Sequence, residues 1–226
     1  MEDLRKDVAL GCRILGLEDQ GDFVWGHVSV RDSEGRGVWM KAGGYGFDEL
    51  TAEQVILVSW EGDVLEGDLP RHAEYPIHTE LMRARPDVKA VVHTHAPWSV
   101  AFASTQEPLR PLSHAGTLFV PPDIARFTQT GDLIVTAELG RDLAATVGDR
   151  NAALMVHHGI VACGGDVPTA VFAAVFLERA CRTNMRALAA GGPKTWSSDE
   201  EALAKRQHVY SPQAAWDYFA RRLDSG

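Results

Sequence analysis

Two histidines follow an apolar run near the middle of the chain, in the segment Ala90-Val-Val-His-Thr-His95. The short apolar run predicts a buried strand, and side chains two residues apart on a strand point to the same face. His93 and His95 would therefore project together from one strand end. Such a pair is half of a metal site, and it requires a fold that brings further ligands to the same place. The alternative is a pair of packed core histidines.

A second histidine pair, His157-His158, ends the next apolar run and is followed by Gly159, where the chain can turn sharply. The run predicts a strand over residues 153–157, and adjacent strand residues point to opposite faces, so only one of the pair should join the site. Three neutral imidazoles with an open fourth position are typical of a catalytic metal site. An unrelated polar strand end is the alternative.

Two carboxylates, Glu74 and Glu80, lie shortly before the first histidine pair. A carboxylate beside a metal can be a ligand, or it can move a proton during the reaction. Either glutamate can equally belong to a solvated helix face.

The remaining patterns predict a mixed α/β chain. Helical spacing of apolar residues predicts helices over residues 1–19, 75–85, 97–104 and 167–190 and one or two helices over 199–223, with weaker helical patterns over 123–128 and 138–147. Alternation predicts further strands over residues 27–31, 38–40 and 56–60. No repeat or linker divides the sequence, so we expect one domain over residues 1–226.

Charge and cysteine content exclude several classes of partner. The formal net charge is −9 and the basic residues are scattered, so nucleic acid and anionic membranes are poor partners. Cys12, Cys163 and Cys181 are odd in number and widely spaced, which favours a reduced, cytoplasmic protein over a disulfide framework. The charged N-terminal segment resembles neither a signal peptide nor a membrane span.

The sequence resembles the class II aldolase/adducin family. The resemblance is carried by Glu74-Tyr-Pro-Ile-His78, by the segment 85–96 and by His157-His158-Gly159 before a long Ala-rich helix. Gly26-His-Val-Ser-Val-Arg31 is similar to that family's Gly-Asn-Val-Ser-Val-Arg loop, and the similarity extends over about residues 5–190. It implies an α/β/α three-layer domain with a largely antiparallel central sheet, and a homotetramer with active sites at subunit interfaces.

Carried over residue by residue, the resemblance implies one divalent metal ion per subunit. The ligands would be His93, His95 and His158, since the family's third ligand is the histidine directly before the glycine. Zinc, manganese and iron all suit such ligands.

The resemblance also implies Glu74 as the catalytic acid or base, while Glu80 matches no functional position. His78 would support the metal ligands without binding the metal itself. The family's aldolases donate a proton from a tyrosine near the middle of the chain, and here that stretch carries His114. His114 is a substitute acid, a substrate-binding group or a structural histidine.

Three departures from the family pattern affect the phosphate-binding residues of its sugar-phosphate aldolases. His27 replaces an asparagine, Ala42-Gly43-Gly44 lies near the usual Thr-Gly turn, and Arg71-His72-Ala73 replaces a Ser-Ser pair. A phosphate dianion needs several converging donors, so these changes argue against a sugar-phosphate substrate.

Aromatic and basic residues in the same region suit a planar anionic substrate, because rings stack and cations hold carboxylates. The expected substrate-binding residues are His27, Arg31, Lys41 and His72, with Trp25 and Trp39 nearby. The tryptophans can instead be core residues and Arg31 a structural ion-pair residue.

These features resemble the family's metal-dependent decarboxylases of hydroxylated aromatic or pyridine dicarboxylates. We therefore expect a carbon–carbon lyase acting on a small anionic molecule, with Lewis-acid stabilisation of the charge that bond cleavage leaves. The alternatives are an aldolase of a hydroxy-acid or sugar phosphate, an iron-dependent oxygenase, and a non-catalytic adducin-like module.

Overall fold

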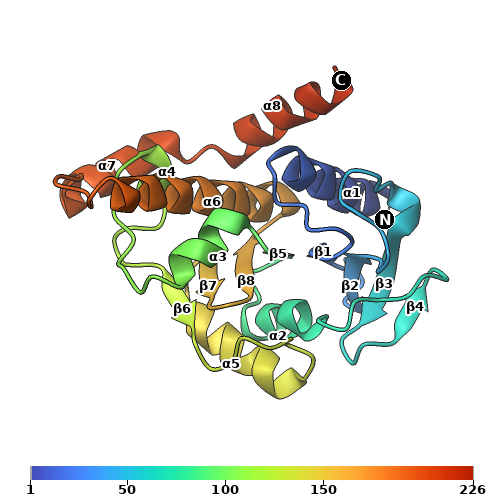
Figure 1. Cartoon of the computed structure of the whole chain (residues 1–226). Helices are drawn as coiled ribbons and strands as arrows, with labels where there is room; N and C mark the ends of the chain where they lie inside the picture. Colours follow the sequence, from blue (N-terminus) through green and yellow to red (C-terminus); the bar gives the residue numbers. More distant parts are fainter. Residues whose placement is uncertain (1, 226) are drawn as a thin grey trace.

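The computed structural model describes residues 2–225, and its centre is one sheet of eight strands in the order β4-β3-β2-β1-β5-β8-β7-β6 (Figure 1). All neighbouring strands are antiparallel except β6 and β7, which are parallel. The strands are β1 (His27–Arg31), β2 (Gly37–Lys41), β3 (Val55–Ser59), β4 (Val64–Glu66), β5 (Ala90–Thr94), β6 (Ala125–Phe127), β7 (Ala152–Met155) and β8 (Gly159–Gly164).

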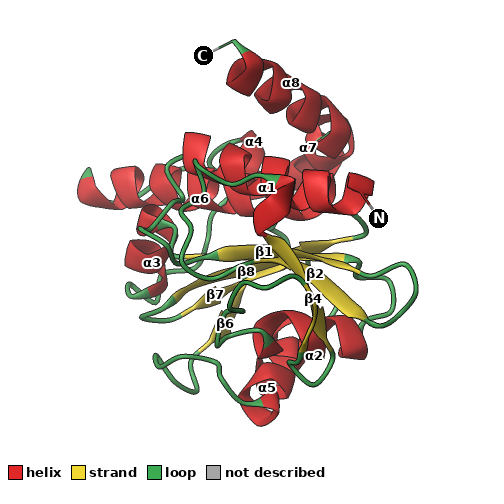
Figure 2. Cartoon of the chain, turned by 90° about the vertical axis from the view of Figure 1, so that its right-hand side faces the viewer, coloured by secondary structure: helices red, strands yellow, loops and turns green. Residues whose placement is uncertain are grey.

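Helices cover both faces of this sheet (Figure 2). One face packs against α1 (Glu2–Leu17) and α6 (Val167–Ala189), with α8 (Pro212–Asp224) packed on those two, and the other face packs against α2 (Pro76–Ala84) and α5 (Ala137–Val147). The shorter elements are η1 (Ala52–Gln54), α3 (Pro97–Ala103), α4 (His114–Thr117) and α7 (Asp199–Val209). The expected three-layer fold with a largely antiparallel sheet is confirmed.

Strand alternation divides the core into two parts, one on each face. Val28 and Val92 pack toward α1 and α6, whereas Val91 and Val161 pack toward α2 and α5. Burying apolar surface on both faces fixes the strand register, because a slip of one residue would exchange the two sets of side chains.

One of the predicted elements was wrong, and two strands, the short exposed β4 and the buried β8, were not predicted. Residues 123–128, with their weak helical pattern, contain β6, because Ala125–Phe127 pairs in parallel with β7 and that tertiary pairing overrides propensity. The strand β8 was missed. It is apolar on both faces because both are covered, so it lacks alternation, and Gly159 begins it rather than ending the preceding strand.

No described helix is long and apolar enough to cross a membrane. Every named strand in the described part belongs to the one sheet, and a single domain over residues 1–226 stays a prediction.

Candidate metal and substrate site

The strand order brings histidines from separate segments together at one end of the central strands. Strand β5 lies between β1 and β8, and its register places His93 opposite His27 of β1. On the other side Thr94 pairs with Ile160 of β8, so the turn before β8 lies beside the end of β5. Residues from three distant segments therefore meet where these strands end.

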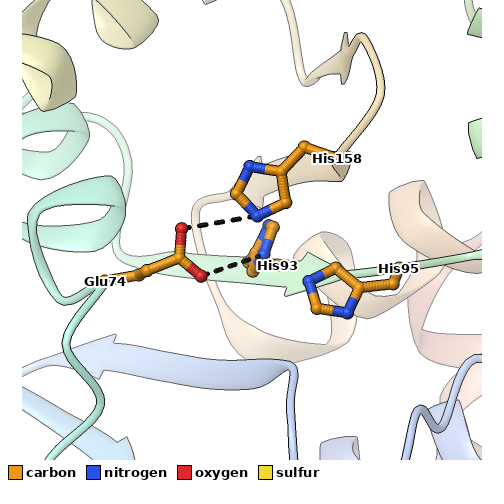
Figure 3. Close-up of side chains that lie close together, drawn as sticks. All are labelled: Glu74, His93, His95 and His158. Atoms are coloured by element: carbon orange, nitrogen blue, oxygen red, sulfur yellow. Dashed lines mark ion pairs between the residues drawn. The ribbon is translucent and has the colours of Figure 1, made fainter. Parts of the chain in front are cut away.

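His93, His95, His158 and Glu74 lie together at these strand ends (Figure 3). Each offers one ligand atom, and these atoms all lie within 4.8 Å of one another. His93 comes from β5, His95 from just beyond it, His158 from the turn before β8 and Glu74 from just before α2. The structure thus brings together the three predicted metal ligands and the predicted catalytic carboxylate.

The hydrogen bonds of two of these rings leave their inward nitrogens free. His93 Nδ1 donates to the carbonyl oxygen of Ile160 at 2.8 Å, and His95 Nδ1 donates to Oδ2 of Asp22 at 2.8 Å. Each Nε2 then carries a lone pair, and both Nε2 atoms are buried without a hydrogen-bond partner. An outer hydrogen bond that orients the ring is the usual arrangement of a metal-binding histidine.

His158 completes the set, because neither of its ring nitrogens has a hydrogen-bond partner although both are buried. Its Nε2 lies 3.4 Å from Oε1 of Glu74. Three buried imidazole nitrogens that face one another without partners fit a divalent cation, which would satisfy them all.

Glu74 is held beside these rings by the main chain. Its Oε1 accepts the N–H of Ile134 at 2.8 Å, and its Oε2 lies 3.8 Å from Nε2 of His93. Burial alone would raise the pKa of Glu74, but His158, His93 and the Ile134 N–H outweigh it and lower the pKa to about 2. The carboxylate is therefore ionised at neutral pH and can accept a proton or hold a water molecule.

A cavity of about 660 Å³ opens beside the cluster. Its lining combines imidazoles and carboxylates with the apolar side chains of Trp25, Pro97, Val100 and Leu133. The polar lining residues are Asp22, His27, His72, Glu74, His95, His157 and His158.

Of the predicted substrate-binding residues, His27 and His72 line this cavity, whereas Arg31 and Lys41 do not. The Arg31 guanidinium donates to the carbonyl oxygens of Met82 at 2.5 Å and Val88 at 3.1 Å. It satisfies carbonyls around the end of α2, so the structure places it in a structural role.

Lys41 is fully buried behind His72. Its ammonium donates to the carbonyl oxygen of Val24 at 2.9 Å and lies 3.2 Å from His72 Nε2. Burial lowers the pKa of Lys41 to about 8, and burial with the nearby Lys41 charge lowers the pKa of His72 to about 4. Lys41 therefore acts on the cavity through His72 rather than by contact.

Three other predicted residues lie outside the cavity lining. His78 is buried and contacts His27 and Ser29 rather than a ring of the proposed ligand set. His114 is exposed at the start of α4, so its predicted catalytic role has no support within this chain. Glu80 pairs with Arg83 at 2.9 Å, as a structural residue would.

His157 and His158 do not lie in a strand, so the predicted strand over residues 153–157 extends too far. Strand β7 ends at Met155, and the pair lies in a tight turn in which the His158 N–H donates to the Met155 carbonyl at 3.1 Å. His157 has a φ of +63°, a left-handed backbone that non-glycine residues seldom adopt. This turn directs His158 toward the cluster, while His157 lines the cavity.

Asp22, which orients His95, was missed by the sequence analysis. An aspartate in a glycine-flanked loop reads as a turn residue, and 73 positions separate it from His95. The cavity wall formed by Leu133 was also missed, because nothing in the loop around it carries a recognisable pattern.

Comparison with known proteins agrees with this geometry. Residues 6–185 match the family model described as the class II aldolase and adducin N-terminal domain. A 3,4-dihydroxyphthalate decarboxylase from Arthrobacter keyseri is 30% identical, over 98% of this chain and 94% of that protein. An L-fuculose phosphate aldolase from Escherichia coli is 31% identical over 86% of this chain and 87% of its own length.

Among solved structures, an L-fuculose 1-phosphate aldolase from Glaciozyma antarctica superposes with a TM-score of 0.84 at 26% identity, covering 99% of this chain and 88% of that one. The chain belongs to the class II aldolase/adducin family. The predicted class of enzyme, a carbon–carbon lyase, is confirmed by these aldolase and decarboxylase relatives.

Proposed function

We propose that the protein is a metal-dependent decarboxylase of a hydroxylated aromatic or pyridine dicarboxylate. One observation carries this proposal: the cluster of three histidines and Glu74 borders a cavity whose lining combines imidazoles with apolar side chains. A planar ring with acidic substituents suits such a lining, because its faces are apolar and its edge carries oxygens. The similarity to a 3,4-dihydroxyphthalate decarboxylase supports the same class of substrate.

The cavity lining argues against a sugar phosphate. Among the described residues that line it, none is Ser, Thr, Asn, Gln, Lys or Arg. The side-chain donors are the imidazoles, and with the indole of Trp25 they do not make the hydroxyl and amide cradle that a phosphate dianion needs.

The chemistry follows from the residues at the cluster. A divalent cation held by His93, His95 and His158 would supply Lewis-acid stabilisation of the negative charge left when carbon dioxide departs. Glu74, ionised and fixed by the Ile134 N–H, is placed to hold a water molecule, take a proton from it and pass that proton to the carbon that loses the carboxylate, leaving hydroxide. The apolar side chains that line the cavity would exclude water from the face of the bound substrate ring.

The principal alternative is aldol cleavage to an aldehyde, favoured by the similarity to L-fuculose phosphate aldolases. The same residues suit both reactions, because each leaves negative charge beside an oxygen-bearing carbon. An iron-dependent oxygenase would consume oxygen instead. A non-catalytic adducin-like module has no need of the ligand set that this chain retains.

Zinc, manganese and iron all suit the three imidazoles, so the identity of the metal belongs to this proposal. We also propose a homotetramer with active sites at subunit interfaces, in which part of the cavity mouth is covered by a neighbour. Trp25 and Leu133 line the cavity and are 55% and 50% exposed in the single chain, as residues at such an interface would be.

The test is a product assay on the metal-loaded protein with a panel of hydroxylated benzene and pyridine dicarboxylates, alongside sugar phosphates. We expect stoichiometric release of carbon dioxide from at least one ring substrate, loss of this activity in Glu74→Gln, and no oxygen uptake. Aldehyde release from a sugar phosphate, without carbon dioxide release from any ring substrate, would contradict the decarboxylase and support the aldolase.

A further inference from the structure

Three buried side chains form a continuous hydrogen-bonded relay that begins at His27 in the cavity lining. His27 Nδ1 lies 2.6 Å from His78 Nε2, and His78 Nδ1 lies 2.7 Å from Ser29 Oγ. His27 is 2% exposed, and His78 and Ser29 are fully buried. His27 and Ser29 lie on β1 and His78 lies on α2, so these hydrogen bonds also connect the sheet to the helix that follows Glu74.

The position of these residues follows from the fold. His27 and Ser29 are two apart on β1 and share the face that looks toward α2, where His78 lies in the first turns. The His27 ring also lies 4.4 Å from the ring of His72 and 5.0 Å from that of His93, between centroids. His27 therefore lies between His72 of the cavity lining and His93 of the metal-ligand cluster.

The two rings act as neutral groups. Burial lowers the pKa of His27 well below its ordinary value and that of His78 to about 3. A neutral imidazole has one donor and one acceptor nitrogen, so the two hydrogen bonds can be arranged in only two ways. If the Ser29 hydroxyl donates to His78, both rings carry the proton on Nε2. If His27 donates to His78, both rings carry it on Nδ1. In either case Nε2 of His27 is the one ring nitrogen that the relay does not use.

We propose that Ser29 and His78 position His27 so that its Nε2–H donates to an anionic oxygen of the substrate, namely its second carboxylate. This inference rests on the proposed dicarboxylate substrate, whose first acidic group would lie at the metal cluster. With the carboxylate bound, the Ser29 hydroxyl donates to His78 Nδ1, His78 Nε2–H donates to His27 Nδ1, and His27 Nε2–H donates to the substrate. No ring changes its charge, and no proton enters or leaves the relay.

This arrangement accounts for the composition of the cavity wall. The described residues that line the cavity include no ammonium or guanidinium, so a second carboxylate needs a neutral donor with a fixed direction. A hydrogen bond to a charged group is stronger than a neutral one, and fixing the donor beforehand reduces the entropy lost on binding. Ser29 and His78 are positioning residues, since they reach the substrate only through His27.

The test compares two inert probes, benzoate and phthalate, which differ by one carboxylate. Calorimetry on the zinc-loaded protein measures the ratio of their dissociation constants. We expect phthalate to bind wild type at least about tenfold more tightly than benzoate, as one charge-assisted hydrogen bond would give. The ratio should fall close to one in His27→Leu, fall partly in Ser29→Ala and recover in Ser29→Thr, which restores the hydroxyl. His208→Leu, an exposed histidine on α7, is the matched control and should keep the wild-type ratio.

Nitrogen-15 spectra of the imidazoles give a second reading that a purely structural role would not change. In the phthalate complex we expect Nε2–H on both His27 and His78. An unchanged affinity ratio in His27→Leu, no preference for phthalate in wild type, or Nδ1–H on His27 in the complex would each overturn the proposal. If the protein shows the expected binding pattern but releases no carbon dioxide, the proposed reaction is wrong and the anion site stands.

Discussion

At the scale of single residues, the side chains that orient the histidines are as important as the histidines. His95 presents Nε2 to the cluster because Asp22 accepts its Nδ1–H at 2.8 Å. The Asp22 carboxylate also makes the ring more electron-rich, and outer partners of this kind strengthen metal binding.

Asp22→Asn should therefore weaken metal binding by about 10- to 100-fold without unfolding the protein. The amide oxygen still accepts the Nδ1–H, but it lacks the negative charge. Competition with a chelator of known affinity measures the change, and Asp19→Asn, in the same loop, is the matched control. Equal metal affinity in Asp22→Asn and wild type would contradict this role for Asp22.

The residues that could be predicted from sequence are those whose neighbours in the chain carry the signal. His93 and His95 are two apart on a strand, and the resemblance selected His158 and Glu74. Asp22 could not be predicted, because only the folded chain brings its loop to His95. Arg31 and Lys41 were expected at the substrate, yet one binds main-chain carbonyls and the other lies behind His72.

At the scale of elements, a buried carboxylate fixes the helix that supplies part of the apolar lining of the cavity. Glu178 of α6 accepts the N–H groups of Trp98 at 2.9 Å and Ser99 at 2.8 Å, and the Ser99 hydroxyl at 2.7 Å. These N–H groups belong to the first turn of α3, which has no intrahelical partner for them. Glu178 thereby anchors the helix that carries Pro97 and Val100.

Glu178→Ala should lower the free energy of unfolding by about 1–3 kcal/mol, because it leaves buried donors without an acceptor. Urea denaturation followed by circular dichroism measures this change. Glu178→Gln, which keeps one acceptor oxygen, should lose less. A stability equal to wild type in Glu178→Ala would show that α3 is held by other contacts.

The turn between β1 and β2 contains a second buried carboxylate. Asp32 accepts from Arg36 Nε at 3.0 Å and from the Trp39 indole N–H at 3.0 Å. Burial raises the pKa of Asp32, but the hydrogen bonds from Arg36 and Trp39 outweigh this and lower it below the usual range.

Because the folded pKa of Asp32 is the lower one, its stabilisation is complete above the ordinary aspartate range and is lost as the pH falls through the folded pKa. Asp32→Asn should cost about 1–3 kcal/mol of unfolding free energy at pH 7. Urea titrations from pH 7 to pH 3 should show this difference shrinking below about pH 4. A difference that grows as the pH falls would reverse the assigned sign.

Most elements could be predicted, because helices such as α6 and strands such as β1 carry clear periodicity. The exceptions have physical causes. β6 is a three-residue edge strand that exists through its partner β7, and β8 is covered on both faces and so lacks alternation. The turn at His157 depends on a left-handed backbone conformation, which the local sequence does not predict.

At the scale of the whole molecule, exposed apolar side chains gather around the cavity. Phe23 is 79% exposed and contacts Trp25 edge-on, with ring centroids 5.9 Å apart. Leu133, which lines the cavity, is half exposed. An apolar rim of this kind is typical of a surface that another molecule covers.

Phe23→Glu should shift the proposed tetramer toward smaller species, because the charge would be buried at the interface. Sedimentation velocity measures the distribution, and Trp196→Glu, at an exposed aromatic residue outside this rim, is the control. A monomeric wild type, or an unchanged assembly in Phe23→Glu, would rule out this rim as the interface.

The central claim is that His93, His95 and His158 hold a catalytic divalent metal ion. The direct measurement is the metal content of the purified wild type and of His95→Ala, by elemental analysis after dialysis, with circular dichroism to verify folding. The claim predicts close to one equivalent of zinc, manganese or iron per wild-type chain, and a folded His95→Ala protein that has lost most of its metal and its lyase activity. A folded His95→Ala protein that retains full metal and full activity would contradict it.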